Sequence, residues 1–149
     1  MSKQIVTIAL TGRHEEGGLE EVTTQTHEGV LYQKEGADYL LYTEAAEGIN
    51  TSIRLDPSEI RLYRRGEHSS WQAFQLGEFT GGMLTLGASE MVLRIHTSHL
   101  AIEQAEGEGR MQLHYEMWTS SSADPSADPY DVGLGRFTLD LAWQVKDED

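Results

Sequence analysis

Arginines gather in one short stretch of a strongly acidic chain. Four of the eleven Lys and Arg residues lie between positions 54 and 65, whereas Asp and Glu number 25 and the net charge is −14. The four are Arg54, Arg61, Arg64 and Arg65. A guanidinium can hold a carboxylate or a phosphate through two parallel hydrogen bonds. This stretch is therefore the first candidate for binding an anionic group.

The alternation of residues 59–65 indicates which of these arginines faces the interior. Ile60 and Leu62 are in phase, and successive side chains of a strand point to opposite faces. Arg64 then joins the inner face, while Arg61 and Arg65 face solvent. The alternative is that Arg64 pairs with an internal carboxylate such as Glu44 or Glu28.

An inward arginine at the mouth of a barrel would need an apolar and aromatic wall around it. Ligand pockets of this type occur in barrel mouths, where a few polar groups fix the orientation of the ligand. We expect the wall to come from aromatic residues of several strands, namely Tyr39 or Tyr42, with Phe74, Tyr115 and Trp143.

The six histidines do not predict a metal centre. A zinc site without cysteine needs three or four converging His, Asp or Glu side chains. The spacing of His96 and His99 points their rings to opposite faces of a strand, unless a bulge intervenes. His114 and Glu116 share a face, and that face is expected to be solvent. We therefore expect no metal and no cofactor.

No arrangement for nucleophilic or nucleotide chemistry stands out either. The serines lie in no Gly-x-Ser-x-Gly elbow, and Gly133-Leu134-Gly135 lacks the third glycine of a dinucleotide loop. Asp124, Asp128 and Asp131 fit no calcium loop. The sequence therefore predicts no catalytic residue and argues against an enzyme.

Residues 23–28 are polar on both faces, which a half-buried strand does not explain. One reading is a polar interior around His27, which suits a ligand or buried water. The other is an exposed strand edge, which suits dimerisation. The sequence leaves both open.

The elements that must position these residues are strands. Glycines divide the chain into short pieces rich in Val, Ile, Thr, Tyr and Leu that alternate with period two, and no window carries a helical stripe. Ten strands are predicted, at residues 4–11, 19–33, 39–47, 50–55, 59–65, 71–76, 79–86, 91–97, 110–118 and 137–145. Gly29 is expected to mark a bulge or a bend in the second.

Short connections between these strands predict an all-β antiparallel up-and-down meander. Closing the meander into a barrel removes its edges, and a sandwich is the alternative. We expect one domain over residues 1–149, with a polar surface loop at 119–131 and a frayed acidic tail at 146–149.

Charge and composition exclude several classes of partner. A net charge of −14 disfavours nucleic acid and anionic membrane surfaces, which need clustered cations. No apolar run is long enough to span a bilayer, and the first ten residues do not form a signal peptide. The absence of cysteine rules out disulfides and makes the cytoplasm the expected location.

Several runs of strand residues, taken in order, carry a resemblance to a known family. EIRLYRRG at 59–66 and FQLG at 74–77 precede TLG at 85–87 and LRIHT at 93–97, and GRMQLHYEM at 109–117 leads to the closing strand. Together they resemble the YwiB-like family of small bacterial proteins, over residues 4–145. The resemblance implies a lipocalin-like, calycin-type β-barrel with no established activity, cofactor or catalytic residues.

These features favour a non-catalytic protein that binds a small anionic or amphipathic ligand inside the barrel. The alternative is a protein-interaction or homo-oligomeric module that uses an edge or an outer face, where Trp71 or Trp118 points outward. On that alternative the partner is another protein or a second copy of the chain.

Overall fold

The computed structural model describes residues 2–34, 36–44, 46–120 and 130–146, and it is built entirely from strands there. Within these ranges there is no helix, so none is long or apolar enough to cross a membrane. The ten strands are β1 (Ser2–Glu16), β2 (Leu19–Lys34), β3 (Ala37–Glu44), β4 (Ile49–Leu55), β5 (Ile60–Arg65), β6 (His68–Phe74), β7 (Phe79–Leu86), β8 (Ser89–Ala105), β9 (Glu108–Thr119) and β10 (Val132–Val145). The all-β prediction is confirmed.

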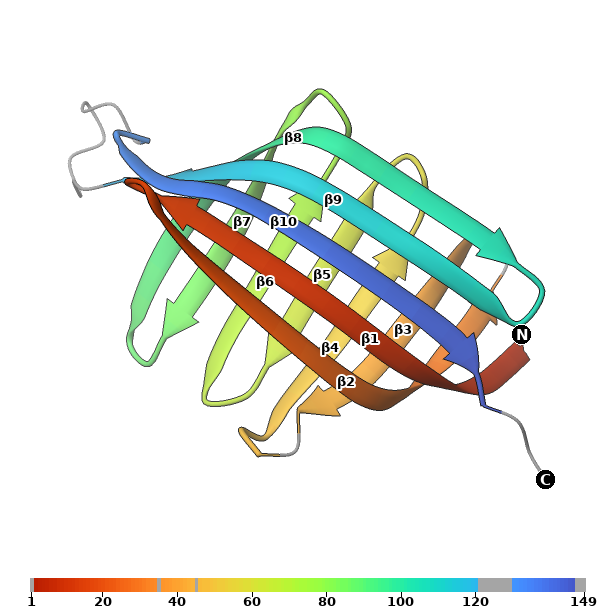
Figure 1. The fold of residues 1–149 in the computed structure, drawn as a ribbon. Coiled ribbons are helices and arrows are strands. Elements are labelled where there is room, and N and C mark those ends of the chain that lie inside the picture. The colour runs from red at the N-terminus through yellow and green to blue at the C-terminus, as the bar shows by residue number, and fades with distance from the viewer. Residues whose placement is uncertain (1, 35, 45, 121–129, 147–149) are drawn as a thin grey trace.

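The strands form one antiparallel barrel. Each strand pairs with its neighbours in sequence, and β1 also pairs with β10, which gives the closed order β1-β10-β9-β8-β7-β6-β5-β4-β3-β2 (Figure 1). The predicted closure of the meander is confirmed, and the sandwich alternative is not adopted. The finer assignment to the lipocalin-like type stays a prediction.

Long and short strands form different sides of the barrel. The strands β1, β2, β8, β9 and β10 have 12 to 17 residues, whereas β3 to β7 have six to eight. In Figure 1 the long strands run diagonally across the front, and the short strands cross behind them. The sequence underestimated β1 because its ends are polar. It underestimated β8 and β10 because register shifts at Thr97/His99 and at Gly133/Gly135 interrupt their apolar alternation.

A hydrophobic core fills one end of this barrel. Its fully buried members include Val6, Ile8, Leu40, Ile60 and Phe74, and Leu55 and Leu31 pack with them. Several of these residues lie at the strand ends beside the β4–β5 turn and near the chain termini. This end of the barrel therefore has a packed interior.

Two glycines allow close packing in the wall. A Cβ at Gly29 would lie 2.5 Å from the Leu41 carbonyl oxygen and 2.6 Å from Ile8 Cδ1, and a Cβ at Gly109 would overlap the indole of Trp143. The pairing of β2 with β1 and β3 runs through Gly29 without a register shift. The predicted bulge at Gly29 is therefore wrong, and the glycine is needed for a close approach instead.

The predicted loop and tail lie mostly outside the described residues. Residues 121–129 and 147–149 are not described, whereas Thr119 is the buried last residue of β9. Lys146 is held in place, because its amide donates to the Ile5 carbonyl at 2.9 Å and its Nζ lies 2.7 Å from Glu28 Oε2. The part of the tail that is described is thus attached to β1 and β2.

Gly109→Ala is expected to lower the free energy of unfolding by about 1–3 kcal/mol, because the added methyl group overpacks the buried Trp143 indole. Gly12→Ala is the matched control. A Cβ there meets nothing closer than 4.0 Å, and Gly12 does not have a positive φ. Urea denaturation of the two variants measures the difference. Equal free energies of unfolding would contradict this account of the wall.

Candidate functional site

The interior of the barrel is hollow at the end opposite the packed core. A cavity of about 350 Å³ lies there, and its lining mixes apolar side chains from β7, β8, β9 and β10 with polar ones from β2, β3, β5 and β6. The lining residues are Leu10, Gln25, Tyr42, Glu44, Leu62, Arg64, Ser70, Gln72, Leu84, Met91, Leu93, Tyr115, Met117, Leu134, Phe137 and Leu139. The barrel thus has one end filled by the hydrophobic core and one end with a cavity that can hold a small ligand.

Arg64 lies at the polar side of this cavity, as the parity of β5 indicates. Its Nη2 donates to both carboxylate oxygens of Glu44, at 3.2 and 3.1 Å. The Glu44 side chain is only 7% exposed, whereas that of Arg64 is 40% exposed. Arg64 therefore pairs with an internal carboxylate, as the alternative reading expects. Glu28 is not its partner, because Glu28 bonds Lys146.

The ion pair leaves part of the guanidinium available. Within the described chain, no side chain or carbonyl accepts a hydrogen bond from Nε or Nη1 of Arg64. The charge is compensated by Glu44, and the remaining donors belong to a side chain that lines the cavity and is 40% exposed. Such an arrangement suits a polar oxygen of a guest better than it suits a second full negative charge.

A column of aromatic rings connects the cavity to the core. His14 stacks on Phe137 at 4.2 Å between centroids, Phe137 stacks on Tyr115 at 5.3 Å, and Tyr115 meets Phe74 edge-on at 4.7 Å. His14 Nε2 also lies 2.6 Å from the Leu134 carbonyl oxygen. His14 and Phe137 are site residues that the sequence alone did not single out, although the alternation of residues 137–145 places Phe137 on the inner face.

Tyr115 lies deep in this column. Burial raises the pKa of its phenol well above the ordinary value, because the charged phenolate is disfavoured away from water. Among the described residues none makes a hydrogen bond to its hydroxyl. Tyr115 also lines the cavity, so a ligand there can contact its ring.

The polar segment of β2 borders the cavity on another side. Gln25 lines it, and Gln25 Oε1 lies 2.8 Å from His27 Nε2. His27 stacks on Tyr42 at 4.9 Å, and burial is the main cause that raises the pKa of Tyr42. The inner face of this segment is thus the polar interior that the sequence left as one of two readings.

The remaining predicted wall residues are not at the cavity. Phe74 and Trp143 are inward but belong to the packed core. The structure contradicts an inward position for Tyr39. Leu40, Tyr42 and Glu44 alternate inward along β3, so Tyr39 faces outward, where the Lys34 ammonium lies 5.1 Å from its ring centroid. Tyr39 and Tyr42 differ by an odd number of positions, so only one of them could line the interior.

A second correction concerns the histidines. The register of β8 and β9 shifts between Thr97 and His99, so a bulge does intervene there. His96 and His99 therefore share the outer face, where they contact Phe79 and His114 respectively. In the part of the chain that the structure covers, no three His, Asp or Glu side chains are grouped to hold a metal ion.

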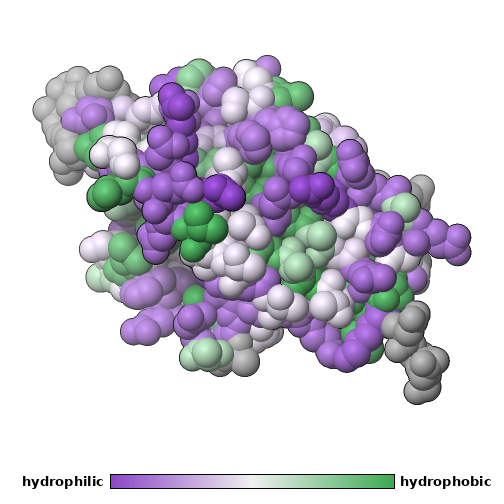
Figure 2. Space-filling view, viewed as in Figure 1, coloured by the Kyte–Doolittle hydropathy of each residue, from purple (hydrophilic) through white to green (hydrophobic). Residues whose placement is uncertain are grey.

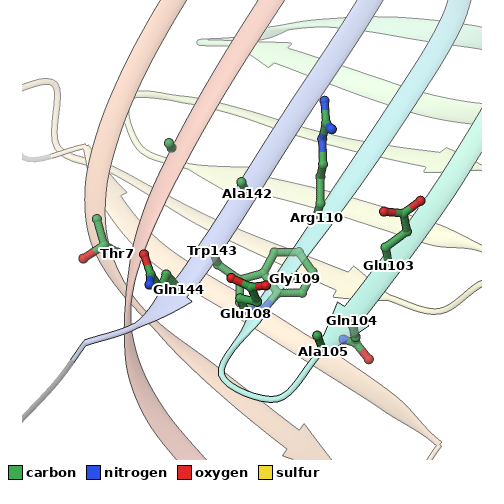
Figure 3. A pocket seen from close by; sticks show the side chains of 11 residues that line it. Thr7, Glu103, Gln104, Ala105, Glu108, Gly109, Arg110, Ala142, Trp143 and Gln144 are labelled. Atoms are coloured by element: carbon green, nitrogen blue, oxygen red, sulfur yellow. The ribbon is translucent and has the colours of Figure 1, made fainter.

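The outer wall also has a shallow pocket, of about 480 Å³, over β8, β9, β10 and β1 (Figure 3). Its floor is formed by small residues such as Ala9 and Ala142, whereas the Trp143 side chain points inward and is only 3% exposed. Arg110 borders the pocket and is paired with Asp140 at 2.9 Å. Figure 2 shows mostly polar side chains on this face. This pocket lacks the enclosure of the interior cavity.

Comparisons with known proteins agree with this fold. The model of a family described as a domain of unknown function (DUF1934) matches residues 8–126. The structure superimposes on the crystal structure of the YwiB protein from Bacillus subtilis with a TM-score of 0.79, at 20% identity, covering 97% of this chain and 94% of that one. No curated protein matches the chain. The resemblance to YwiB-like proteins is confirmed, and the structural likeness shows the fold alone.

The buried phenol of Tyr115 is expected to make the protein sensitive to alkali. An unfolded tyrosine titrates near pH 10, whereas the folded one keeps its proton, so stability falls as the pH rises above about 10. One pH unit above that value the loss is about 1.4 kcal/mol. Tyr115→Phe should remove the part of the alkaline loss that this phenol causes and leave the part caused by Tyr42, whose pKa burial also raises, as measured by denaturation between pH 8 and about 11.

The control for this titration is Tyr32→Phe on β2, whose ring lies near Lys3. This variant should retain the alkaline loss. If Tyr115→Phe loses stability as steeply as the wild type above pH 10, Tyr115 is not the buried group that titrates.

Proposed function

We propose that this chain, which belongs to the DUF1934 family, is a non-catalytic protein that binds a small amphipathic molecule in the cavity of its barrel. The observation that carries the proposal is the division of that cavity into an apolar wall and a polar side. The lipocalin-like type of barrel that the sequence resemblance implies is compatible with such a role, because small barrels of this kind can hold one ligand.

The size of the cavity limits the guest. Its volume of about 350 Å³ is near the lower end of the roughly 300–1,000 Å³ that ligand pockets span. The apolar part of the guest would contact Leu84, Leu93 and Leu139. Burial of the apolar surface of the ligand contributes about 25 cal/mol per Å² to the free energy of binding.

The polar side of the cavity determines which head group of the ligand fits. Arg64 offers free donors beside Glu44, and Ser70, Gln72 and Gln25 add neutral polar groups. Since Glu44 already compensates the Arg64 charge, we infer that an uncharged or zwitterionic head fits better than a simple anion. The sequence suggested an anionic or amphipathic ligand, and the ion pair narrows this class to amphipathic ligands with an uncharged or zwitterionic head group.

The chemistry of the lining supports binding without catalysis. The ionisable groups that face the cavity are the Arg64–Glu44 pair and the phenols of Tyr42 and Tyr115. Burial raises the pKa of both phenols, so each stays neutral near pH 7. No described lining residue combines a nucleophile with a base within hydrogen-bond reach.

An aromatic cluster on the outer face favours a second candidate function, a protein-interaction module. The Arg94 guanidinium lies 4.2 Å from the Phe79 ring centroid, and Phe79 lies 6.1 Å from Trp118. Phe79 is 56% exposed and Trp71 on the neighbouring strand is 37% exposed. Exposed aromatic residues beside an arginine are enriched where proteins bind one another.

The binding proposal is tested with decanol and decanoate, which share an apolar chain and differ in head group. Decanol at a hundredfold excess over its Kd should raise the melting temperature by several degrees, since that excess contributes about 2.7 kcal/mol. Leu84→Trp, which fills the cavity, should abolish the shift. Met83→Trp is the matched control, because Met83 is the neighbouring residue on the opposite face of β7.

Arg64→Ala and Arg61→Ala separate the head-group contact from the apolar one. Arg64→Ala should weaken decanol binding about tenfold, which corresponds to about 1.4 kcal/mol, and Arg61→Ala on the outer face should leave it unchanged. Isothermal titration measures both. A shift that survives Leu84→Trp, or the absence of any shift with either probe, would remove the proposal.

A further inference from the structure

Half of β2 has a strand edge that no other strand covers. β2 pairs with β1 along its whole length, from Leu19 to Gln33, but with β3 only from Gly29 onward. Residues 19–28 therefore present one edge without a partner strand in the described chain. This is the same segment that the sequence showed to be polar on both faces.

The turn between β1 and β2 determines which backbone groups lie on that edge. Gly17 and Gly18 form a two-residue connection, and both have a positive φ, of 59° and 83°. In such a hairpin the flanking pair, Glu16 and Leu19, exchanges both hydrogen bonds. The backbone groups of the odd-numbered residues of β2 then form hydrogen bonds with β1. The N–H and C=O groups of the even-numbered residues point the other way, toward the free edge. These residues are Glu20, Val22, Thr24, Thr26 and Glu28.

The centre of this edge lacks the usual protection. Natural edge strands carry charged side chains, especially lysine, or a proline or a bulge that blocks pairing with another chain. Here the charges are Glu20, Glu21 and Glu28, which lie toward the two ends of the segment. Residues 19–28 contain neither lysine nor proline, their register with β1 is unbroken, and residues 22–26 are uncharged and rich in threonine.

β8 also has an edge that is only partly paired with a neighbouring strand, but other segments of the chain contact that edge. β8 pairs with β7 only as far as His96, so residues 98–105 lack a strand on that side. However, the Gly77 amide donates to the Thr97 carbonyl at 2.8 Å, and Gln104 Nε2 donates to Asp38 at 2.8 Å. Contacts from the β6–β7 turn and from β3 thus occupy both ends of this edge.

We propose that the free edge of β2 pairs with the same edge of a second copy of this chain, antiparallel and across a two-fold axis. A two-fold contact places one strand against itself, so the edge must be compatible with its own sequence. With the axis at Thr23, Val22 faces Thr24 and Glu20 faces Thr26 of the other copy. No glutamate then faces a glutamate, whereas an axis at Thr24 would set Glu20 against Glu28.

The new strand pair would lie beside the cavity. Gln25 belongs to both the free edge segment and the cavity lining, and Glu44 lies at the end of β3 where β2 has diverged from it. The second copy would narrow this gap. The pairing needs only backbone groups, so it does not rest on the presence of a ligand.

Sedimentation velocity on the full chain tests the proposal. The expected mass is twice the 16.7 kDa of the chain. Because each copy carries a net charge of −14, the dimer should strengthen between about 0.15 M and about 1 M salt, as screening weakens the repulsion. A basic peptide bound at the same edge would instead dissociate as salt rises.

Thr24→Pro removes one outward N–H and should make the protein monomeric, with an unchanged far-UV spectrum. Proline is tolerated where an edge N–H faces away from the ladder. Thr24→Val keeps the N–H and should remain dimeric. Should Thr24→Pro fold poorly, the double substitution Val22→Lys with Thr24→Lys sets lysines opposite one another and should also give a monomer.

Three results would overturn the proposal: a wild type that stays monomeric at high salt, a folded Thr24→Pro protein that is as dimeric as the wild type, or assemblies that grow beyond two copies. The melting shift with decanol is measured separately. A monomer that still binds decanol would refute the dimer and leave the binding function intact.

Discussion

Closure of the hydrogen-bond ladder through β1 is the constraint on which the rest of the molecule depends. β1 pairs with β10 on one side and with β2 on the other, and so joins the first and last strands of the meander. Once the wall is closed, the two-residue period of each strand assigns every side chain to the inside or the outside. Arg64 is inward and Arg61 is outward for this reason alone.

The closed wall has two ends with different interiors. Phe74 and Trp143 belong to the packed end, where the apolar area buried stabilises the barrel. The other end holds the Arg64–Glu44 pair and the cavity. An ion pair at a half-buried site contributes little net stability, because desolvation offsets much of its attraction. Its position beside a hollow apolar wall is a feature on which the proposed binding role rests.

The sequence predicted the all-β class, the ten strands and the inward face of Arg64, because these depend on local alternation. It did not resolve features that depend on pairing between strands. The bulge before His99 reverses the face of that residue, and alternation alone cannot show it. Tyr39 was offered beside Tyr42 as a lining residue by residue type alone, although its parity differs from that of Leu40. The column through His14 and Phe137 joins strands distant in sequence.

The opening of the cavity and the free edge have one structural origin, the divergence of β2 from β3 at Gly29. At this glycine Ile8 and Leu41 approach so closely that no side chain fits, and the two strands are paired from there toward the packed end. In the other direction His27 stacks on Tyr42 in place of a continued ladder. Had β3 continued beside β2, its backbone would have satisfied the edge and covered Gln25. The polarity of residues 23–28 follows from this position, because their inner side chains face the polar interior beside Gln25 and their outer side chains face solvent.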